Sequence, residues 1–246
     1  MTDHSGVKPH LHRWQVLAAG VASLILTVGL ARFAYTPLLP VMHAETGLSN
    51  ASGGWLATIN YVGYMLGAVL AAALREGRLR YAFYRFNLVA AVIGTAGMGM
   101  TQNVVLWAIL RFIAGIASTG GMLVASGLIL KWLLHHRRRP DLGAHFMGVG
   151  LGLAVSGVAA VLMAHRLDWA SQWFALGALL FIPAWFWMPA PAPIAAEQTA
   201  TEAPAAKASM GWLLSSAYFC AGVGYVISAT FLVAIVTQQS GAASTG

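Results

Sequence analysis

The chain has 246 residues, of which 59% are hydrophobic and only 9% are charged, and its mean hydropathy is +0.71. Soluble domains carry about 25% charged residues, so this composition excludes an ordinary soluble domain and indicates a polytopic membrane protein. The formal charge of +7 does not indicate nucleic-acid binding, because the basic residues stand in short clusters between apolar runs. The single cysteine, Cys220, excludes a disulfide framework and a cysteine-rich metal site.

Apolar runs of about 20 residues or more, long enough to cross a bilayer, follow one another along the chain. Lys8 and Arg13 precede the first run, as in a secretory signal. That run exceeds the roughly 7–15 residues of a signal core, so we expect it to remain as an anchor. The sequence predicts about seven spans, at residues 14–42, 55–74, 83–100, 104–134, 142–164, 169–188 and 210–236.

The loops between these spans alternate in charge. Basic residues precede the first span and follow the second and the fourth, whereas the intervening loops carry little net charge. Because basic loops stay on the cytoplasmic side, this alternation predicts a cytoplasmic N-terminus. The basic loop residues are Lys8, Arg13, Arg75, Arg78, Arg80, Lys131, Arg137, Arg138 and Arg139.

A composition change after the sixth span suggests a boundary between two parts of the chain. Residues 189–209 are rich in alanine and proline, which is typical of a flexible linker. The linker separates a tail (residues 1–13) and a six-helix bundle (residues 14–188) from a seventh span (residues 210–236). Residues 237–246 carry no further membrane signal, and a lone helix has no bundle to join. The pattern suggests an N-terminal fragment, with a complete seven-span protein as the alternative.

Two arginines, Arg32 and Arg111, lie well inside predicted spans. An arginine in hydrocarbon costs about 2.5–3.5 kcal/mol on insertion scales, so Arg32, in the sequence GLARFAYTPLLPVM, is a candidate functional residue. Arg111 lies in the fourth span, and a helical rise of about 1.5 Å per residue places both arginines in the outer half of the membrane. If the two helices are neighbours, the two charges favour an anion between them. For Arg111, the alternative is a structural arginine that is bonded to backbone carbonyls.

No acidic residue falls within the seven predicted spans. The carboxylate that commonly carries a coupling proton or sodium ion is therefore absent from this part of the sequence. Coupling would then depend on a missing part of the protein or on the charge of the solute. This observation favours an anionic solute.

Other polar and small residues recur at helical spacing within the spans. Polar residues are candidates for lining a solute cavity, although a single one more often bonds to a neighbouring helix. Small residues let helix backbones approach closely. The candidate cavity residues are Arg32, Tyr35, Asn60, Tyr64, Tyr225 and Ser228, and the candidate packing residues are Gly63, Gly67, Gly115, Gly148 and Gly152.

The sequence shows no pattern of catalytic or metal-binding chemistry. Its histidines have no partners at ligand spacing, and it contains neither a glycine-rich phosphate loop nor an assembled nucleophile and base. We therefore expect no metal, cofactor or nucleic acid. A membrane enzyme or assembly scaffold is the alternative hypothesis. It would need a reactive cluster, but the only dense polar cluster, residues 131–141, is typical of a topogenic loop.

The sequence resembles the major facilitator superfamily, and within it the bacterial YbfB/YjiJ-type branch. The resemblance rests on residues 29–42, on GWLATINYVGYMLGA at residues 54–68 and on GYVISATFLVAI at residues 224–235. It implies an all-α membrane fold of two six-helix halves, of which this chain holds the first half and one further helix. It also implies a secondary transporter of the bacterial inner membrane, which moves a small anionic or polar solute by alternating access. Such a transporter is expected to be inactive without its C-terminal half.

The resemblance further implies roles for particular residues. LRFIAGIAS, residues 110–118, is similar to the superfamily's fourth-helix motif. The arginine of that motif, here Arg111, is implicated in proton coupling in some members, so a proton is a candidate partner. The loop after the second span keeps Arg75, Gly77 and Arg78 as a remnant of a superfamily motif but lacks its aspartate.

Overall fold

The computed structural model describes residues 11–163, 166–176, 181–189, 212–213, 216–217 and 219–224. The chain divides into two units, Met1–Pro191 and Ala192–Gly246. All the regular elements in the described ranges are helices, in agreement with the predicted all-α fold. Most of the predicted linker, the candidates Tyr225 and Ser228, and the polar tail lie outside the described residues.

The first predicted span is one continuous helical run. It consists of helix α1 (Arg13–Leu24), the π-helical segment η1 (Ile25–Phe33) and helix α2 (Tyr35–Thr46). The run covers 34 residues and most of it is buried within the bundle. It ends at Gly47, whose φ of 69° is the left-handed conformation that glycine adopts at helix ends without steric cost.

The second and third predicted spans are two consecutive helices. Helix α3 (Asn50–Ala73) begins after Ser49, whose hydroxyl oxygen accepts a hydrogen bond from the backbone N–H of Ser52 at 3.1 Å. Helix α4 (Gly77–Ala96) continues into the short 3₁₀ segment η2 (Gly97–Met100). Three arginines lie in the first half of α4, so this helix is less apolar than its neighbours.

The fourth span is again one long run with a π-helical interruption. Helix α5 (Val104–Thr119), segment η3 (Gly120–Ala125) and helix α6 (Ser126–His135) together cover 32 residues. The side chain of Asn103 caps α5 by accepting hydrogen bonds from the first backbone N–H groups. Both long runs of the bundle therefore change helix type near their middle.

The remaining described helices of the first unit are α7 (Gly143–Met163), α8 (Trp169–Leu176) and α9 (Phe181–Phe186). Helix α7 corresponds to the fifth predicted span, and α8 and α9 lie within the sixth. Four helical runs in the described residues are long and apolar enough to cross a membrane. These are Arg13–Thr46, Asn50–Ala73, Val104–His135 and Gly143–Met163.

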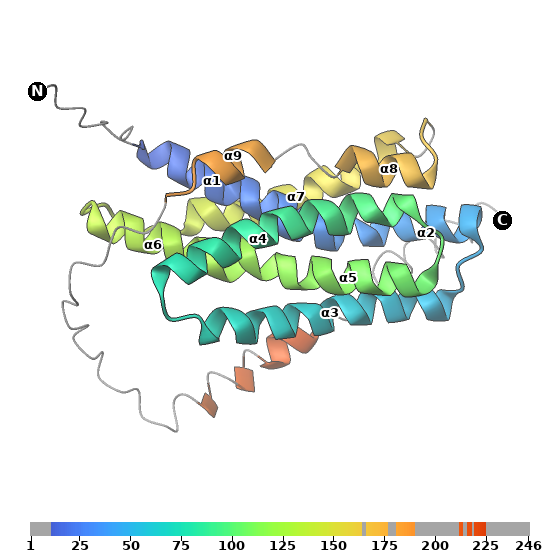
Figure 1. Ribbon diagram of the computed structural model, residues 1–246, viewed down its shortest axis with the longest axis horizontal. Coiled ribbons are helices and arrows are strands. Elements are labelled where there is room, and N and C mark those ends of the chain that lie inside the picture. Colours follow the sequence, from blue (N-terminus) through green and yellow to red (C-terminus); the bar gives the residue numbers. More distant parts are fainter. Residues whose placement is uncertain are drawn as a thin grey trace, which may run out of the picture. The chain divides into compact units, whose positions relative to one another are not determined.

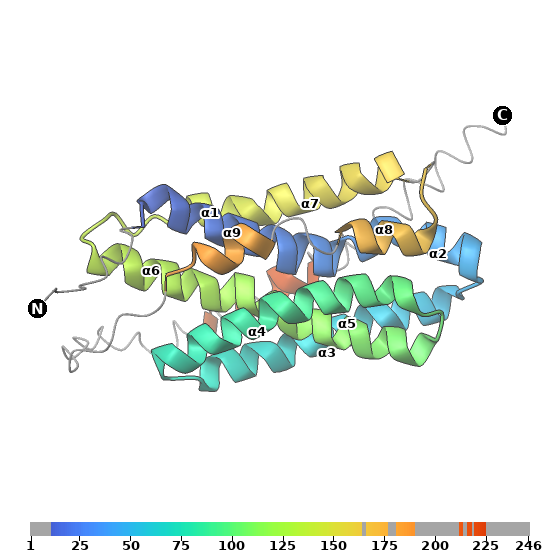
Figure 2. The same cartoon turned by 45° about the horizontal axis from the view of Figure 1, so that its top comes forward.

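The long helices of the first unit run side by side (Figure 1). Helix α5 lies between α3 and α4 and also contacts η1, while α7 packs along α1 and η1. Turning the view shows the same pairing, with α1, α7 and α9 on one side and α3, α4 and α5 on the other (Figure 2). The first helical run is therefore in contact with both groups.

Glycines allow α3 and α5 to touch backbone to backbone. A Cβ atom at Gly63 would collide with the carbonyl oxygen of Phe112, and one at Gly115 would collide with the carbonyl oxygen of Asn60. The backbone N–H nitrogen of Tyr64 lies only 2.9 Å from that second position. Close approach of this kind is how membrane helices gain van der Waals contact without a hydrophobic driving force.

The other predicted packing glycines also lie at helix crossings. A Cβ atom at Gly67 would lie 2.8 Å from the side chain of Thr119, which belongs to α5. Gly152 in α7 faces Gly29 in η1, and Gly148 faces the backbone of α1. The structure therefore places all five candidates where a larger side chain would separate two helices.

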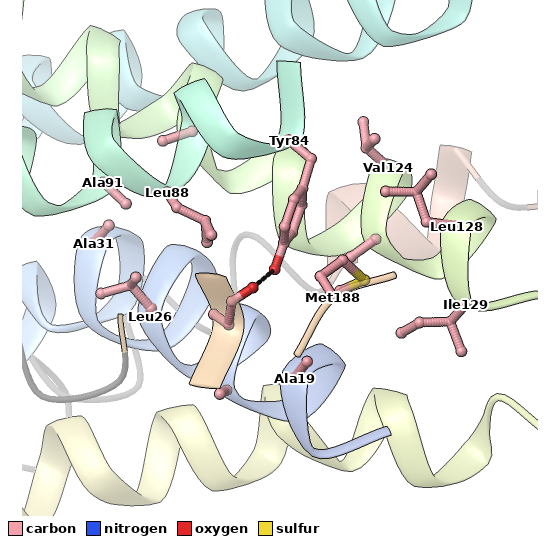
Figure 3. Packing of buried hydrophobic residues seen from close by; sticks show 14 of the residues in the cluster. Ala19, Leu26, Ala31, Tyr84, Leu88, Ala91, Val124, Leu128, Ile129 and Met188 are labelled. Atoms are coloured by element: carbon pink, nitrogen blue, oxygen red, sulfur yellow. Dashed lines mark hydrogen bonds between the residues drawn. The ribbon is translucent and has the colours of Figure 1, made fainter. Parts of the chain in front are cut away.

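A buried tyrosine joins α4 to α9 within the hydrophobic core (Figure 3). The hydroxyl of Tyr84 donates a hydrogen bond to the carbonyl oxygen of Ala184 at 2.7 Å. Leu88, Leu128 and Met188 are buried in the same cluster. The hydrogen bond satisfies the hydroxyl of a ring that is otherwise surrounded by apolar groups.

A carboxylate connects the C-terminal end of the first span with the N-terminal end of the sixth. Glu45, in the last turn of α2, accepts a hydrogen bond from the backbone N–H of Trp169 at 3.1 Å. The Trp169 ring meets the Trp107 ring edge to face at a centroid distance of 5.7 Å. Asp168 precedes α8, and a hydrogen bond from Ser171 holds the pKa of its carboxyl below the ordinary value. Glu45 thus supplies a negative charge at the helix N-terminus from another span.

We expect Gly115→Ala to destabilise the bundle, because the added methyl group would force the α3 and α5 backbones apart. Overpacking of this kind costs roughly 1–3 kcal/mol. Gly127→Ala is the matched control, because a Cβ atom at Gly127 meets no atom within 4 Å. Thermal unfolding of both variants in detergent would compare them with the wild type. Equal midpoints for Gly115→Ala and Gly127→Ala would contradict the close contact.

Candidate functional site

The candidate site lies where the end of η1 meets α3. The guanidinium carbon of Arg32 is 4.6 Å from the ring centroid of Tyr61 and 4.5 Å from that of Tyr64. It also lies 5.5 Å from the ring centroid of Phe33. Arg32 is partly buried, and within the described residues no hydrogen bond or ion pair reaches its guanidinium. Its positive charge is therefore held against aromatic faces while its N–H donors remain unused.

The local backbone explains why carbonyl groups are free near Arg32. In the π-helical segment η1 the hydrogen bonds shift by one residue, as the bond from the Ala34 N–H to the Gly29 carbonyl shows. Pro37 follows in the next turn and has no N–H to donate. The carbonyls at the end of η1 are thus available to donors from other helices.

Arg111 uses two of these carbonyls. Its guanidinium donates to the carbonyl oxygens of Ala31 at 3.0 Å and of Arg32 at 3.3 Å. The same group lies over the Tyr35 ring, with 4.3 Å between the guanidinium carbon and the ring centroid. Arg111 is 2% exposed, so it is a buried cation bonded to the backbone of a neighbouring helix. This is the geometry of the structural alternative, and a coupling role for Arg111 stays a prediction.

Two other cavity candidates also bond to neighbouring helices. The hydroxyl of buried Tyr35 donates to the carbonyl oxygen of Gly53 at 2.9 Å. The side-chain amide of Asn60 donates to the carbonyl oxygen of Arg111 at 2.8 Å. Both side chains therefore contribute to helix packing in this conformation. Their proposed contact with a solute remains a prediction.

The structure brings Arg32 and Arg111 to the same level of the bundle. The sequence argument required their helices to be neighbours, and the hydrogen bonds from Arg111 to the η1 backbone show that they are. Tyrosine rings lie against both guanidinium groups, and an anion between the two arginines stays a prediction. Each such contact contributes roughly 0.5–2 kcal/mol.

Tyr61 is a contact of the site that sequence reasoning missed. It precedes Tyr64 by three residues, a spacing that places both rings on one face of α3. The sequence pattern of polar residues indicates Asn60 instead, four residues before Tyr64. The sequence feature that could have identified Tyr61 is its spacing of three residues from Tyr64, in a chain that also has an arginine within a neighbouring span.

The cytoplasmic-loop residues lie apart from this cluster. Gly77 begins α4 and is buried, whereas Arg75 and Arg78 are exposed. The Nε of Arg80 donates to the carbonyl oxygen of Leu74 at 2.7 Å and so closes the turn. In the part of the chain that the structure describes, no three His, Cys, Asp or Glu side chains gather as metal ligands.

Comparisons with known proteins give a consistent result. The family model described as "Uncharacterised MFS-type transporter YbfB" matches residues 24–246. The niacin transporter NiaP of Acinetobacter baylyi is 25% identical over 58% of this chain and 32% of its own length. The cis,cis-muconate transport protein of the same organism is 26% identical over 70% of this chain and 41% of its own length.

A third relative is the uncharacterized MFS-type transporter YcaD of Salmonella enteritidis. It is 29% identical over 63% of this chain and 41% of its own length. The chain thus spans less than half the length of these relatives. No solved structure matches it. The family match covers most of the chain, and the chain therefore belongs to the YbfB-type family of major facilitator superfamily transporters, which are multi-pass membrane proteins.

Proposed function

We propose that this chain forms the solute-binding bundle of a secondary transporter that moves a small carboxylate by alternating access. The observation that carries the proposal is the guanidinium of Arg32, which has aromatic contacts but no hydrogen-bond acceptor among the described residues. Arg32 lies within the first run, about 20 Å from its C-terminal end at a rise of 1.5 Å per residue. A cation at that depth is a functional site by default.

The chemistry of the guanidinium favours a carboxylate. Arginine presents five N–H donors in a planar fork, and this fork matches the two oxygens of a carboxylate. The faces of Tyr61 and Tyr64 contact the guanidinium of Arg32 but accept none of its N–H groups in conventional hydrogen bonds. The buried charge of Arg111 lies at the same level and adds to the attraction for an anion.

The relatives support this class of solute. One is named for niacin and another for cis,cis-muconate. Both compounds are unsaturated carboxylates, which combine a negative group with a flat apolar part. In our proposal the carboxylate pairs with Arg32 and the flat part lies near the rings of Tyr61 and Tyr64. The further cavity candidates Tyr225 and Ser228 belong to the same proposal.

The proposed membrane arrangement follows the basic loops. We infer that the N-terminus is cytoplasmic and that the membrane is the bacterial inner membrane. The inference is supported by the exposed basic residues after α3 and α6. Alternating access needs two bundles that rock around a central site, so a second bundle is the proposed partner. We propose that this chain binds solute but does not transport it without that partner.

We expect Arg32→Gln to weaken binding of niacin or cis,cis-muconate by at least about tenfold, because charge-assisted hydrogen bonds contribute roughly 1.5–3 kcal/mol. The measurement is equilibrium binding of the radiolabelled acids to the chain in lipid nanodiscs. Arg78→Gln removes an exposed charge and is the matched control. Equal binding by Arg32→Gln and the wild type, or equal binding of a neutral amide analogue, would contradict the proposal.

We expect Arg111→Ala to act mainly on stability. The substitution removes the two hydrogen bonds that Arg111 donates to the η1 backbone and should lower the free energy of unfolding by roughly 1–3 kcal/mol. Arg32→Ala loses only aromatic contacts, worth about 0.5–1 kcal/mol at a partly exposed site. Thermal unfolding of both variants in detergent tests this order. The reverse order would show that Arg111 is not the structural anchor.

The topology proposal is tested with single cysteines in a Cys220→Ser background. A cysteine at Arg138 should react with a membrane-impermeant maleimide only in inverted vesicles, because the basic loop faces the cytoplasm. A cysteine at Gln102, in the loop before α5, should react only in intact cells whose outer membrane is permeabilised. The opposite labelling pattern would reverse the orientation.

A further inference from the structure

A second buried titratable group lies away from Arg32. His145, the third residue of α7, is completely buried. Its ring packs against α1, where a Cβ atom at Gly20 would lie 2.5 Å from the Nδ1 of His145. The absence of a side chain at Gly20 therefore makes the space that the imidazole occupies.

The imidazole of His145 has no hydrogen-bond partner for either nitrogen. The backbone carbonyls of Gly20 in α1 and Gly121 in η3 lie beside the ring, but neither bond is formed with good geometry. A neutral imidazole has one donor and one acceptor, so it can donate to only one carbonyl. An imidazolium has two N–H donors and fits two carbonyls. Both carbonyls can therefore be bonded at once only when the ring is protonated, and burial of the ring opposes that protonation.

No carboxylate contacts the ring to balance that charge within the described residues. Helices α1 and α6 and segment η1 carry only basic groups, and the single acidic group of α2, Glu45, is bonded to Trp169. Helix α8 and segment η3 carry no titratable side chain. The titratable and charged groups of the packed elements are Arg13, Arg32, Tyr35, His43, Glu45, Lys131 and His135.

Polar groups connect the ring with the opposite side of the bundle. The hydroxyl of Ser23 donates to the carbonyl of Gly20 at 2.8 Å. Ser23 also lies beside the hydroxyl of Tyr84, which donates to the carbonyl of Ala184 in α9 (Figure 3). Through Gly20, Ser23 and Tyr84, the surroundings of His145 are thus connected by polar contacts to α1, α4 and α9.

We propose that His145 is a proton-binding site, in which the protonated ring bridges the carbonyls of Gly20 and Gly121 and so ties α7 to α1 and η3. The site is distinct from the solute site, because Gly20 and Arg32 are about 18 Å apart at a rise of 1.5 Å per residue. The predicted spans contain no carboxylate that could carry a coupling proton. In a transporter, His145 would carry that proton instead. This coupling role rests on the proposed function, whereas proton binding does not.

The direct test is nuclear magnetic resonance of the chain in nanodiscs, with ¹⁵N-labelled histidine and ¹³C-labelled glycine carbonyls, between pH 8 and pH 3. His145→Gln assigns the ring signals, and His136→Gln, at an exposed position, is the matched control. We expect the His145 ring to change from the neutral to the doubly protonated pattern. The carbonyl signals of Gly20 and Gly121 should shift with the same midpoint in the wild type and in His136→Gln, but not in His145→Gln.

A ring that stays neutral throughout this range, or carbonyl signals that do not follow it, would overturn the proton site. The coupling role is tested with proteoliposomes that contain the chain together with its second bundle. His145→Gln should lose the accumulation driven by a pH gradient and keep solute exchange, whereas Arg32→Gln should lose both. Gradient-driven accumulation that survives in His145→Gln would overturn the coupling role. Absence of exchange in the wild type would instead overturn the proposed transport function.

Discussion

The buried guanidinium of Arg111 is the interaction on which the centre of the bundle depends. A cation that is 2% exposed must have acceptors, and the end of η1 provides them as backbone carbonyls. The same arginine offers its own carbonyl to Asn60 in α3 and its charge to the ring of Tyr35. One residue thus connects α3, α5 and the first helical run. Arg111 thus bonds two carbonyls and keeps only its Nε–H without an acceptor, whereas the guanidinium of Arg32 makes no hydrogen bond within the described residues.

The helical spans follow from hydropathy alone, but the π-helical segments do not. The sequence ILTVGLARF at Ile25–Phe33 contains ordinary helix-forming and apolar residues, so it predicts an α-helix and gives no sign of the π-helical form. Packing decides the outcome, because the backbone of η1 must meet Gly152 of α7 and the side chain of Arg111 together.

The candidate site was only partly predictable for a related reason. A charge in an apolar run identifies Arg32 and Arg111 from sequence, since its cost does not depend on the fold. Their partners are backbone carbonyls and ring faces, which have no sequence signature. Tyr61 and Tyr64 gain their meaning only when α3 is placed beside η1. The sequence of α7 likewise gives no sign that His145 is buried, because the space for its ring is provided by Gly20 on another helix.

The glycine contacts restrict how the bundle can move. Gly63 and Gly115 each fit against a carbonyl of the opposite helix, so α3 and α5 interlock at two points along their length. Two such points prevent either helix from rotating about its own axis or sliding by less than a full turn. Gly29 and Gly152 lock η1 to α7 in the same manner. If the proposed solute binds at Arg32, it meets helices that these glycine contacts hold at fixed spacing, and the proposal then implies selection by fit to a rigid surface.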